Sequence, residues 1–208
     1  MNDLSAGQDG LARCGWGTST AEMCAYHDAE WGRPVADDQR VFEKLCLEGF
    51  QAGLSWLTIL RKREAFREAF SGFDPVAVAT FGARDIERLL KDVRIVRHRG
   101  KIEAAIANAR ATVELRDEGV SLAGLVWQHR PVKHPAPRRL ADLAPSIPEA
   151  KALSGELRKR GFKFVGPTTV FAAMQALGLV NDHLVGCHWR RIAKDERAKF
   201  TVPSSRRS

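Results

Sequence analysis

The chain has 208 residues and a net charge of +8, with 44% hydrophobic and 28% charged residues. This length suffices for one sizeable core or two small lobes around a cleft, and the composition is typical of a globular protein. We find no segment apolar enough to span a bilayer and no basic and apolar leader typical of a signal peptide, so we expect a cytoplasmic protein with no membrane partner. The excess of basic residues favours an anionic partner such as nucleic acid.

Apolar residues recur with helical spacing along almost the whole chain, and no segment alternates long enough to predict a strand. The first predicted helix begins at Asp37 or Asp38, where acidic residues favour a helix N-terminus, and ends near residue 53. The other predicted helices span 55–70, 83–92, 101–118, 148–160 and 167–177. Residues 130–148 hold five prolines and predict a loop, which could separate two lobes. The fold class is therefore all-α.

Residues with metal-ligand chemistry lie near both ends of the chain. Cys14 precedes His27 by thirteen positions, and His183 precedes Cys187 by four, about one helical turn. Two thiolates and two imidazoles form the closed set typical of structural zinc, which would join the N-terminal segment to the C-terminal one. The spacing alone leaves an alternative open, in which these side chains are simply buried or exposed without a metal.

A carboxylate and several aromatic residues suggest a binding slot. Glu48 lies at the edge of the apolar face of its predicted helix, where an unpaired carboxylate is costly to bury. Trp16, Tyr26 and Trp31 come from the N-terminal segment, and Trp56 follows the helix of Glu48. Such residues suit an electron-poor planar ring, with aromatic faces above and below and an anionic acceptor at its edge. The alternative is an ordinary core whose acid reaches solvent.

A basic stretch at 91–101 has the pattern of a helix end, a tight turn and a helix start. The N-terminus of a helix offers backbone N–H groups to a phosphate. Arg97, His98, Arg99 and Lys101 surround this turn with positive charge, which predicts sequence-independent binding to a DNA backbone. A basic surface loop is the alternative interpretation.

Six ordered motifs together resemble those of the 3-methyladenine DNA glycosylase I family, and the likeness covers residues 12–188. The motifs are RCGW (13–16), YHDAEWG (26–32), LCLEGFQAGLSW (45–56), IVRHRGKI (95–102), KRGFKFVGPT (159–168) and GLVNDHLVGC (178–187). One departure lies in the hairpin turn, where the family often has glycine and this chain has Val93 and Arg94.

The resemblance implies a helix-hairpin-helix glycosylase fold with two helical lobes around a base pocket. It implies a structural zinc bound by Cys14, His27, His183 and Cys187, and a pocket formed by Glu48, Tyr26 and Trp56 with Trp16 nearby. We expect a monomer whose partner is double-stranded DNA containing alkylated bases. Residues 1–11 are an unmatched extension, and residues 189–208 are expected to be a disordered basic tail.

The implied reaction is hydrolysis of the N-glycosidic bond of 3-methyladenine after base flipping. Alkylation at N3 leaves the base cationic and its bond weak, so Glu48 is expected to recognise the flipped base, and its part in the chemistry stays open. Leu54 is the predicted wedge that fills the vacated stack. No lysine is assigned as a Schiff-base nucleophile, which predicts no strand cleavage. Two alternatives remain: a zinc-stabilised DNA-binding module, and a protein that only sequesters lesions.

Overall fold

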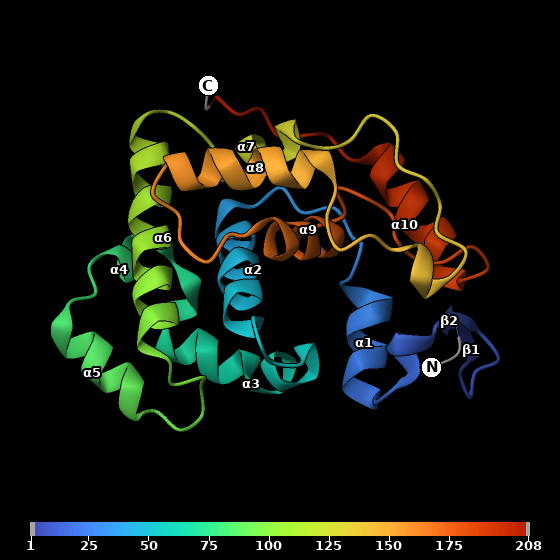
Figure 1. Ribbon diagram of the computed structural model, residues 1–208, viewed down its shortest axis with the longest axis horizontal. Helices are drawn as coiled ribbons and strands as arrows, with labels where there is room; N and C mark the ends of the chain where they lie inside the picture. The colour runs from blue at the N-terminus through green and yellow to red at the C-terminus, as the bar shows by residue number, and fades with distance from the viewer. Residues whose placement is uncertain (1–2, 207–208) are drawn as a thin grey trace.

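The computed structural model describes residues 3–206 and shows a mostly helical protein with one small pair of strands (Figure 1). The described α-helices are α1 (Ala21–Ala29), α2 (Asp38–Gln51), α3 (Trp56–Ala69), α4 (Pro75–Ala79), α5 (Ala83–Lys91), α6 (Arg99–Asp117), α7 (Leu122–Gln128), α8 (Pro148–Lys159), α9 (Pro167–Ala176) and α10 (His188–Lys199). Short 3-10 turns occur at Gly15–Thr18, Ser71–Phe73 and Leu140–Asp142. None of the helices in this part of the chain is long and apolar enough to cross a membrane.

The six predicted helices correspond to α2, α3, α5, α6, α8 and α9, and each agrees within two residues at either end. Side-chain caps explain several of their starts. The Asp37 side chain accepts a hydrogen bond from the backbone N–H of Arg40 at the start of α2, and Ser55 does the same for Thr58 in α3. Periodicity and capping together therefore locate the helices of the core.

The N-terminal segment is more ordered than its sequence predicts. Strand β1 (Leu4–Ala6) pairs antiparallel with β2 (Ala12–Cys14), and α1 follows with Thr20 as its N-cap. These elements lack a clear amphipathic pattern because the helix is short and buries Tyr26 and His27 instead of an aliphatic stripe. Residues 1–2 of the expected N-terminal extension lie outside the described residues.

The prediction of a disordered C-terminal tail is wrong for the part of the tail that the structure describes. Residues 188–199 form α10, whose Ala193 is fully buried. Beyond the helix, the Phe200 ring packs 4.6 Å from that of Trp127, and Arg206 forms a β-bridge with Val120. These few apolar contacts order the segment although most of its residues are charged. Residues 207–208 of the tail lie outside the described residues.

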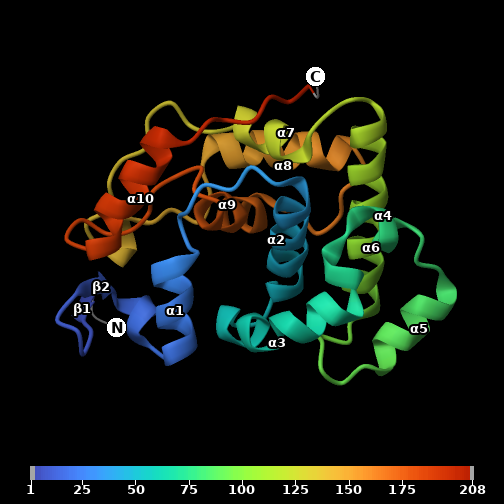
Figure 2. The same ribbon diagram turned by 180° about the vertical axis from the view of Figure 1, so that it is seen from behind.

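Helix α2 crosses the middle of the molecule and contacts α3, α6, α7 and α9. Figures 1 and 2 show α4, α5 and α6 on one side of α2 and α9, with α1, α10 and the strand pair on the other. The core beside α2 is rich in phenylalanine, and the ring of Phe50 lies 4.5 Å from that of Phe66. This core fixes one wall of a cavity that faces α1.

Candidate functional site

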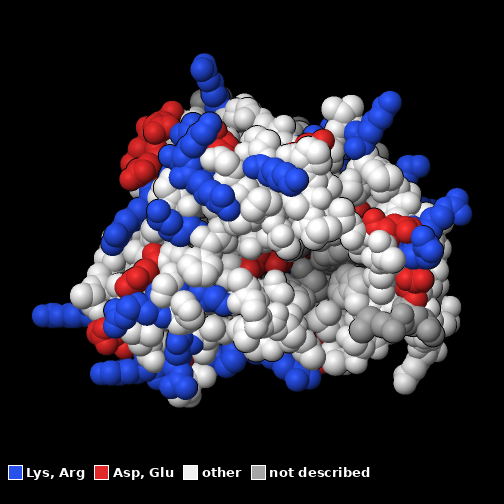
Figure 3. All heavy atoms as spheres, in the orientation of Figure 1, with Lys and Arg blue, Asp and Glu red and all other residues white. Residues whose placement is uncertain are grey.

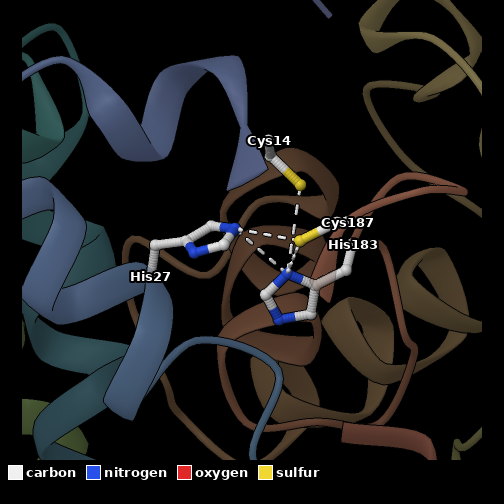
Figure 4. A group of neighbouring side chains, drawn as sticks. All are labelled: Cys14, His27, His183 and Cys187. Atoms are coloured by element: carbon white, nitrogen blue, oxygen red, sulfur yellow. Dashed lines mark hydrogen bonds between the residues drawn. The ribbon is translucent and has the colours of Figure 1, made fainter. Parts of the chain in front are cut away.

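The four predicted metal ligands come together in one buried cluster (Figure 4). Cys14 ends β2, His27 belongs to α1, and His183 and Cys187 come from the loop before α10. The Sγ atom of Cys187 lies 3.6 Å from both His27 Nε2 and His183 Nδ1, and these two nitrogens are 3.2 Å apart. Cys14 Sγ lies 3.9 Å from His183 Nδ1. The cluster could therefore hold a metal ion.

The outer nitrogens of both histidines have partners that leave the inner nitrogens free as ligands. His27 Nδ1 lies 2.8 Å from Asp28 Oδ1, and His183 Nε2 lies 3.2 Å from the Trp31 carbonyl oxygen. Each of these acceptors favours a proton on the outer nitrogen, so the lone pair of the inner nitrogen points into the cluster. Partners of this kind are usual around metal-bound histidine.

The ligand cluster also supports one wall of a nearby cavity. The Trp16 ring lies 5.0 Å from that of His27, and the Trp31 ring lies 4.8 Å from that of His183. The two tryptophan rings contact each other edge to face at 5.0 Å. Because both tryptophans line the cavity, the position of its wall depends on the cluster behind it.

The cavity has a volume of about 310 Å³ and lies where α1, α2, α3 and α9 meet. Its lining residues are Trp16, Met23, Tyr26, Trp31, Glu48, Gln51, Trp56, Leu143, Ala172 and Gln175. The structure thus brings together all the residues that the sequence placed in the slot. Figure 3 shows the surface hollowed between α1 and α2, with acidic atoms at one edge of the hollow.

Glu48 is the buried charged group of this cavity. Glu48 is only 5% exposed. Among the described residues, its carboxylate has no hydrogen-bond donor and no ion-pair partner. Burial raises the pKa of Glu48 to about 7, while the nearby positive charge of Lys44 acts in the opposite direction. An acceptor held this way is poised to bind a donor or a cation that enters the cavity.

Two aromatic side chains flank the carboxylate, and a lysine contacts both. The rings of Tyr26 and Trp56 lie 5.2 Å apart. Lys44 Nζ donates to the Tyr26 hydroxyl at 3.1 Å and lies 4.4 Å from the Trp56 ring centroid. Burial raises the pKa of Tyr26 well above 10, so its hydroxyl stays protonated. Lys44 was not among the residues predicted from the sequence, although its position one turn before Glu48 was a usable signal.

Several other lining residues were also missed. Gln175 belongs to α9, and its Nε2 donates to Asp182 Oδ2 at 2.7 Å, which fixes the amide beside the cavity. Leu143 comes from the proline-rich loop, and Met23 comes from α1. No spacing in the sequence connects these residues to Glu48, because their proximity depends on how the helices pack.

The prediction that Lys101 faces a phosphate is wrong. The residue is buried, and its Nζ donates to the carbonyl oxygens of Phe50 and Ala52 at 2.9 and 2.5 Å. These carbonyls close the C-terminal end of α2, where the helix dipole favours a positive charge. Lys101 therefore joins α6 to the end of α2 and does not extend into solvent.

The other predicted DNA contacts lie at the exposed edge of the molecule. Arg97 is exposed and, within residues 3–206, has no hydrogen bond or ion pair. Arg99 is exposed and pairs with Glu87 at 2.6 Å, while His98 caps α6 by accepting from the Lys101 N–H. Leu54 is 40% exposed in the loop between α2 and α3. Figure 3 shows Lys and Arg side chains gathered over this side of the molecule.

Three turns meet along this edge. The ring of His98 lies 6.3 Å from that of Phe164, which belongs to the turn between α8 and α9. Phe164 in turn contacts the α2 backbone at Gly49, where an added Cβ would lie 3.4 Å from the Cβ of Phe164. The α2–α3 loop, the α5–α6 turn and the α8–α9 turn therefore form one continuous edge beside the cavity.

Comparison with known proteins assigns this arrangement to a family. The family model for methyladenine glycosylase matches residues 16–191, most of the chain. The chain belongs to the methyladenine glycosylase family. It is 49% identical to DNA-3-methyladenine glycosylase 1 of Escherichia coli strain K12 over 180 residues, which covers 85% of this chain and 96% of that protein. It is 44% identical to a DNA-3-methyladenine glycosylase of Haemophilus influenzae over 178 residues, which covers 84% of this chain and 96% of that protein.

Solved structures agree with this assignment. A crystal structure of 3-methyladenine DNA glycosylase I superposes with a TM-score of 0.82 at 47% identity and covers 85% of this chain and 98% of its own. The Staphylococcus aureus enzyme, solved to explain its recognition of 3-methyladenine, superposes with a TM-score of 0.81 at 38% identity and covers 86% and 96%. Methyladenine glycosylases are hydrolases that act in DNA repair, and this chain is an enzyme of that class.

Proposed function

We propose that this enzyme hydrolyses the N-glycosidic bond of 3-methyladenine in alkylated double-stranded DNA, with the base flipped into the cavity between α1, α2 and α3. The single observation that carries the proposal is the unpaired, buried carboxylate of Glu48 within an aromatic cavity of about 310 Å³. A cavity of this size falls within the range of sites that enclose small ligands, and the flat rings of Tyr26 and Trp56 suit a purine.

The residues of the cavity suit a cationic leaving base. In our proposal the Glu48 carboxylate accepts hydrogen bonds from the N–H groups of 3-methyladenine and favours its positive charge, while aromatic faces attract the cation. The alkylated base is already a good leaving group, so the protein has to extract it, hold it and exclude competing groups. Within residues 3–206 no group donates a hydrogen bond to Glu48, so its oxygens are free for this role.

The same cavity supports base release without strand cleavage. Cleavage by a Schiff base requires a lysine amine within reach of the sugar carbon. The cavity lining contains no lysine among the described residues, and the nearby Lys44 is directed to the Tyr26 hydroxyl. We therefore infer a monofunctional glycosylase.

The exposed edge formed by the three turns is the proposed DNA-binding face. Leu54 at its tip is the proposed wedge, because an apolar side chain there can fill the space that a flipped base leaves. Arg97 and Arg99 supply positive charge for phosphates. The α8–α9 turn adds a second hairpin, since Gly166 caps α9 without a side-chain acceptor and leaves backbone N–H groups for a phosphate. This edge supports the assignment to the helix-hairpin-helix glycosylases.

We further propose that the cluster of Cys14, His27, His183 and Cys187 binds one structural zinc ion. Tetrahedral zinc with ordinary bond lengths separates two nitrogen ligands by about 3.3 Å and a nitrogen from a sulfur by about 3.5 Å. The observed separations are 3.2 Å between nitrogens and 3.6 to 3.9 Å between nitrogen and sulfur. Four protein ligands leave no open position, so the ion would supply structure and no step of the reaction.

Base release from methylated DNA tests the proposed function. Duplex DNA treated with a methylating agent is incubated with the enzyme, and free bases and strand breaks are measured separately. We expect 3-methyladenine in solution and intact strands until alkali is added. Tight binding to methylated DNA without base release would indicate a protein that only sequesters lesions. Equal binding to methylated and unmethylated DNA without base release would indicate a simple DNA-binding module, and so would the absence of binding to free 3-methyladenine.

A further inference from the structure

Lys44 occupies an unusual place in the wall of the base cavity. It lies one helical turn before Glu48 on α2, and its ammonium group lies 4.4 Å from the ring centroid of Trp56 and 4.9 Å from that of Tyr26. Burial lowers the pKa of Lys44, which shows that its charge is costly to keep at this position. A positive charge this close to the proposed site of a cationic base would repel that base, so its presence calls for an explanation.

The hydrogen bond from Lys44 determines what the Tyr26 hydroxyl can do. Lys44 Nζ carries only donors, so at 3.1 Å the hydroxyl oxygen must be the acceptor. The proton of the hydroxyl is then directed away from Lys44 and remains available to another acceptor. Tyr26 lines the base cavity, where its O–H group can serve as a donor to a bound ligand.

Behind Lys44 lies a second, smaller cavity with charged walls. Its volume is about 40 Å³, enough for about one or two water molecules. Its walls include Lys44, Glu30, Glu43 and Arg63. Lys44 therefore stands between a small polar cavity on one side and the aromatic rings of the base cavity on the other, which explains how its charge is tolerated.

We propose that Lys44 is a positioning residue of the base site, which orients the Tyr26 hydroxyl and holds Glu48 in its anionic form. This inference rests on the proposed function of the cavity and extends it to a residue that does not touch the base. The titratable and charged groups around Lys44 and Glu48 are Tyr26 from α1, Glu30 at the C-terminal end of α1, Glu43 from α2 and Arg63 from α3, and Arg40 and Arg67 line the small cavity behind Lys44.

The sign of the expected pH effect follows from the charges. Burial raises the pKa of Glu48 and Lys44 lowers it, so removing the lysine charge raises it further. The anionic form that binds the base then appears only at higher pH. For a neighbouring opposite charge the displacement is about one pH unit. The acidic limb of base release should therefore move upward by about one unit in Lys44→Met.

The test compares four variants between pH 6 and 8.5. Lys44→Met removes charge and hydrogen bond, Lys44→Gln keeps a donor for Tyr26 without the charge, and Lys44→Arg keeps both. Lys151→Met makes the same change at an exposed position of α8. Two quantities are measured for each variant: the single-turnover rate of 3-methyladenine release, and the titration of the Glu48 carboxylate by infrared difference spectroscopy against Glu48→Gln.

We expect Lys44→Met to release base about fivefold more slowly at pH 7 and to approach the wild-type rate within about twofold at pH 8.5. The Glu48 titration should move by the same amount, Lys44→Gln should behave likewise, and Lys44→Arg and Lys151→Met should match wild type. A purely structural lysine would lower the rate equally at every pH and leave the titration in place, which would overturn the inference. If Lys44→Met fails to fold, the comparison of Lys44→Gln with Lys44→Arg decides the question. A wild-type enzyme that releases no base at any pH would overturn the proposed function, whereas the carboxylate titration would still test the effect of Lys44.

Discussion

Replacing Glu48 by glutamine separates its proposed role in base recognition from its cost to stability. In the folded protein burial raises the pKa of Glu48 from 4.5 to about 7. An acid whose folded pKa is raised binds protons more tightly in the folded state, so stability falls as pH rises from 4.5 to 7 and then levels off. A difference of this size corresponds to about 3 kcal/mol of unfolding free energy. Glutamine has no charge to desolvate, so Glu48→Gln should not show this loss.

The same substitution should impair function. Hydrogen bonds that involve a charged group are stronger than neutral ones by about 1–2 kcal/mol, which corresponds to about a ten- to thirtyfold effect. We expect that loss in the single-turnover rate of 3-methyladenine release and in affinity for the free base. The predicted variant is therefore more stable than wild type at pH 8 and less active.

The assay measures base release and the urea midpoint side by side at pH 5 and pH 8. Glu114→Gln is the matched control, because Glu114 is exposed on α6 and should leave both quantities unchanged. Full activity of Glu48→Gln would refute the recognition role. A wild-type protein whose stability changes with pH in parallel with that of the variant would refute the argument from burial of the charge.

Three further predictions concern the metal and the DNA-binding edge. Cys187→Ser should remove one ligand and lower the thermal midpoint of unfolding at temperatures where the rate of base release is still unchanged, and chelation of wild type should do the same. Elemental analysis that finds no zinc in protein purified without chelator would contradict the assignment. Arg97→Ala combined with Arg99→Ala should weaken binding to every duplex sequence. The slope of log affinity against log salt concentration should become shallower by up to about two, and an unchanged slope would show that these residues do not contact phosphates. Leu54→Ala should slow base release from duplex DNA by about tenfold and spare affinity for free 3-methyladenine, and equal rates on duplex DNA would count against a wedge.

Sequence patterns predicted the helices of the core but did not predict the structure of the N-terminal and C-terminal segments. The six predicted helices carry apolar stripes and capping residues, which act locally and can be identified from a few neighbouring positions. Helix α10 was missed because most of its residues are polar or charged, and it is held in place by Trp189 and Ala193, with Phe200 just beyond the helix. The contacts of those side chains come from distant parts of the chain, which no local pattern reveals.

The residues of the site also divide into those that the sequence placed correctly and those that it did not. Thiol and imidazole side chains are distinctive ligand types, and the family resemblance singled out Cys14, His27, His183 and Cys187, which the structure brings together in a cluster that could hold a metal. Charge alone misassigned Lys101, since a sequence does not show whether an ammonium group extends to solvent or closes the end of another helix.

The order in which the ligands occur along the chain has a consequence for synthesis. Cys14 and His27 leave the ribosome more than 150 residues before His183 and Cys187. Until then the N-terminal segment can pair with α2 and α3 through Lys44 and Arg63, but Trp31 lacks the His183 ring against which it packs. A chain that has not yet reached His183 can thus bury much of the phenylalanine core around α2 while the cavity wall at Trp31 is incomplete. We therefore expect the cavity to gain its final shape only after residues 183–187 join the N-terminal segment.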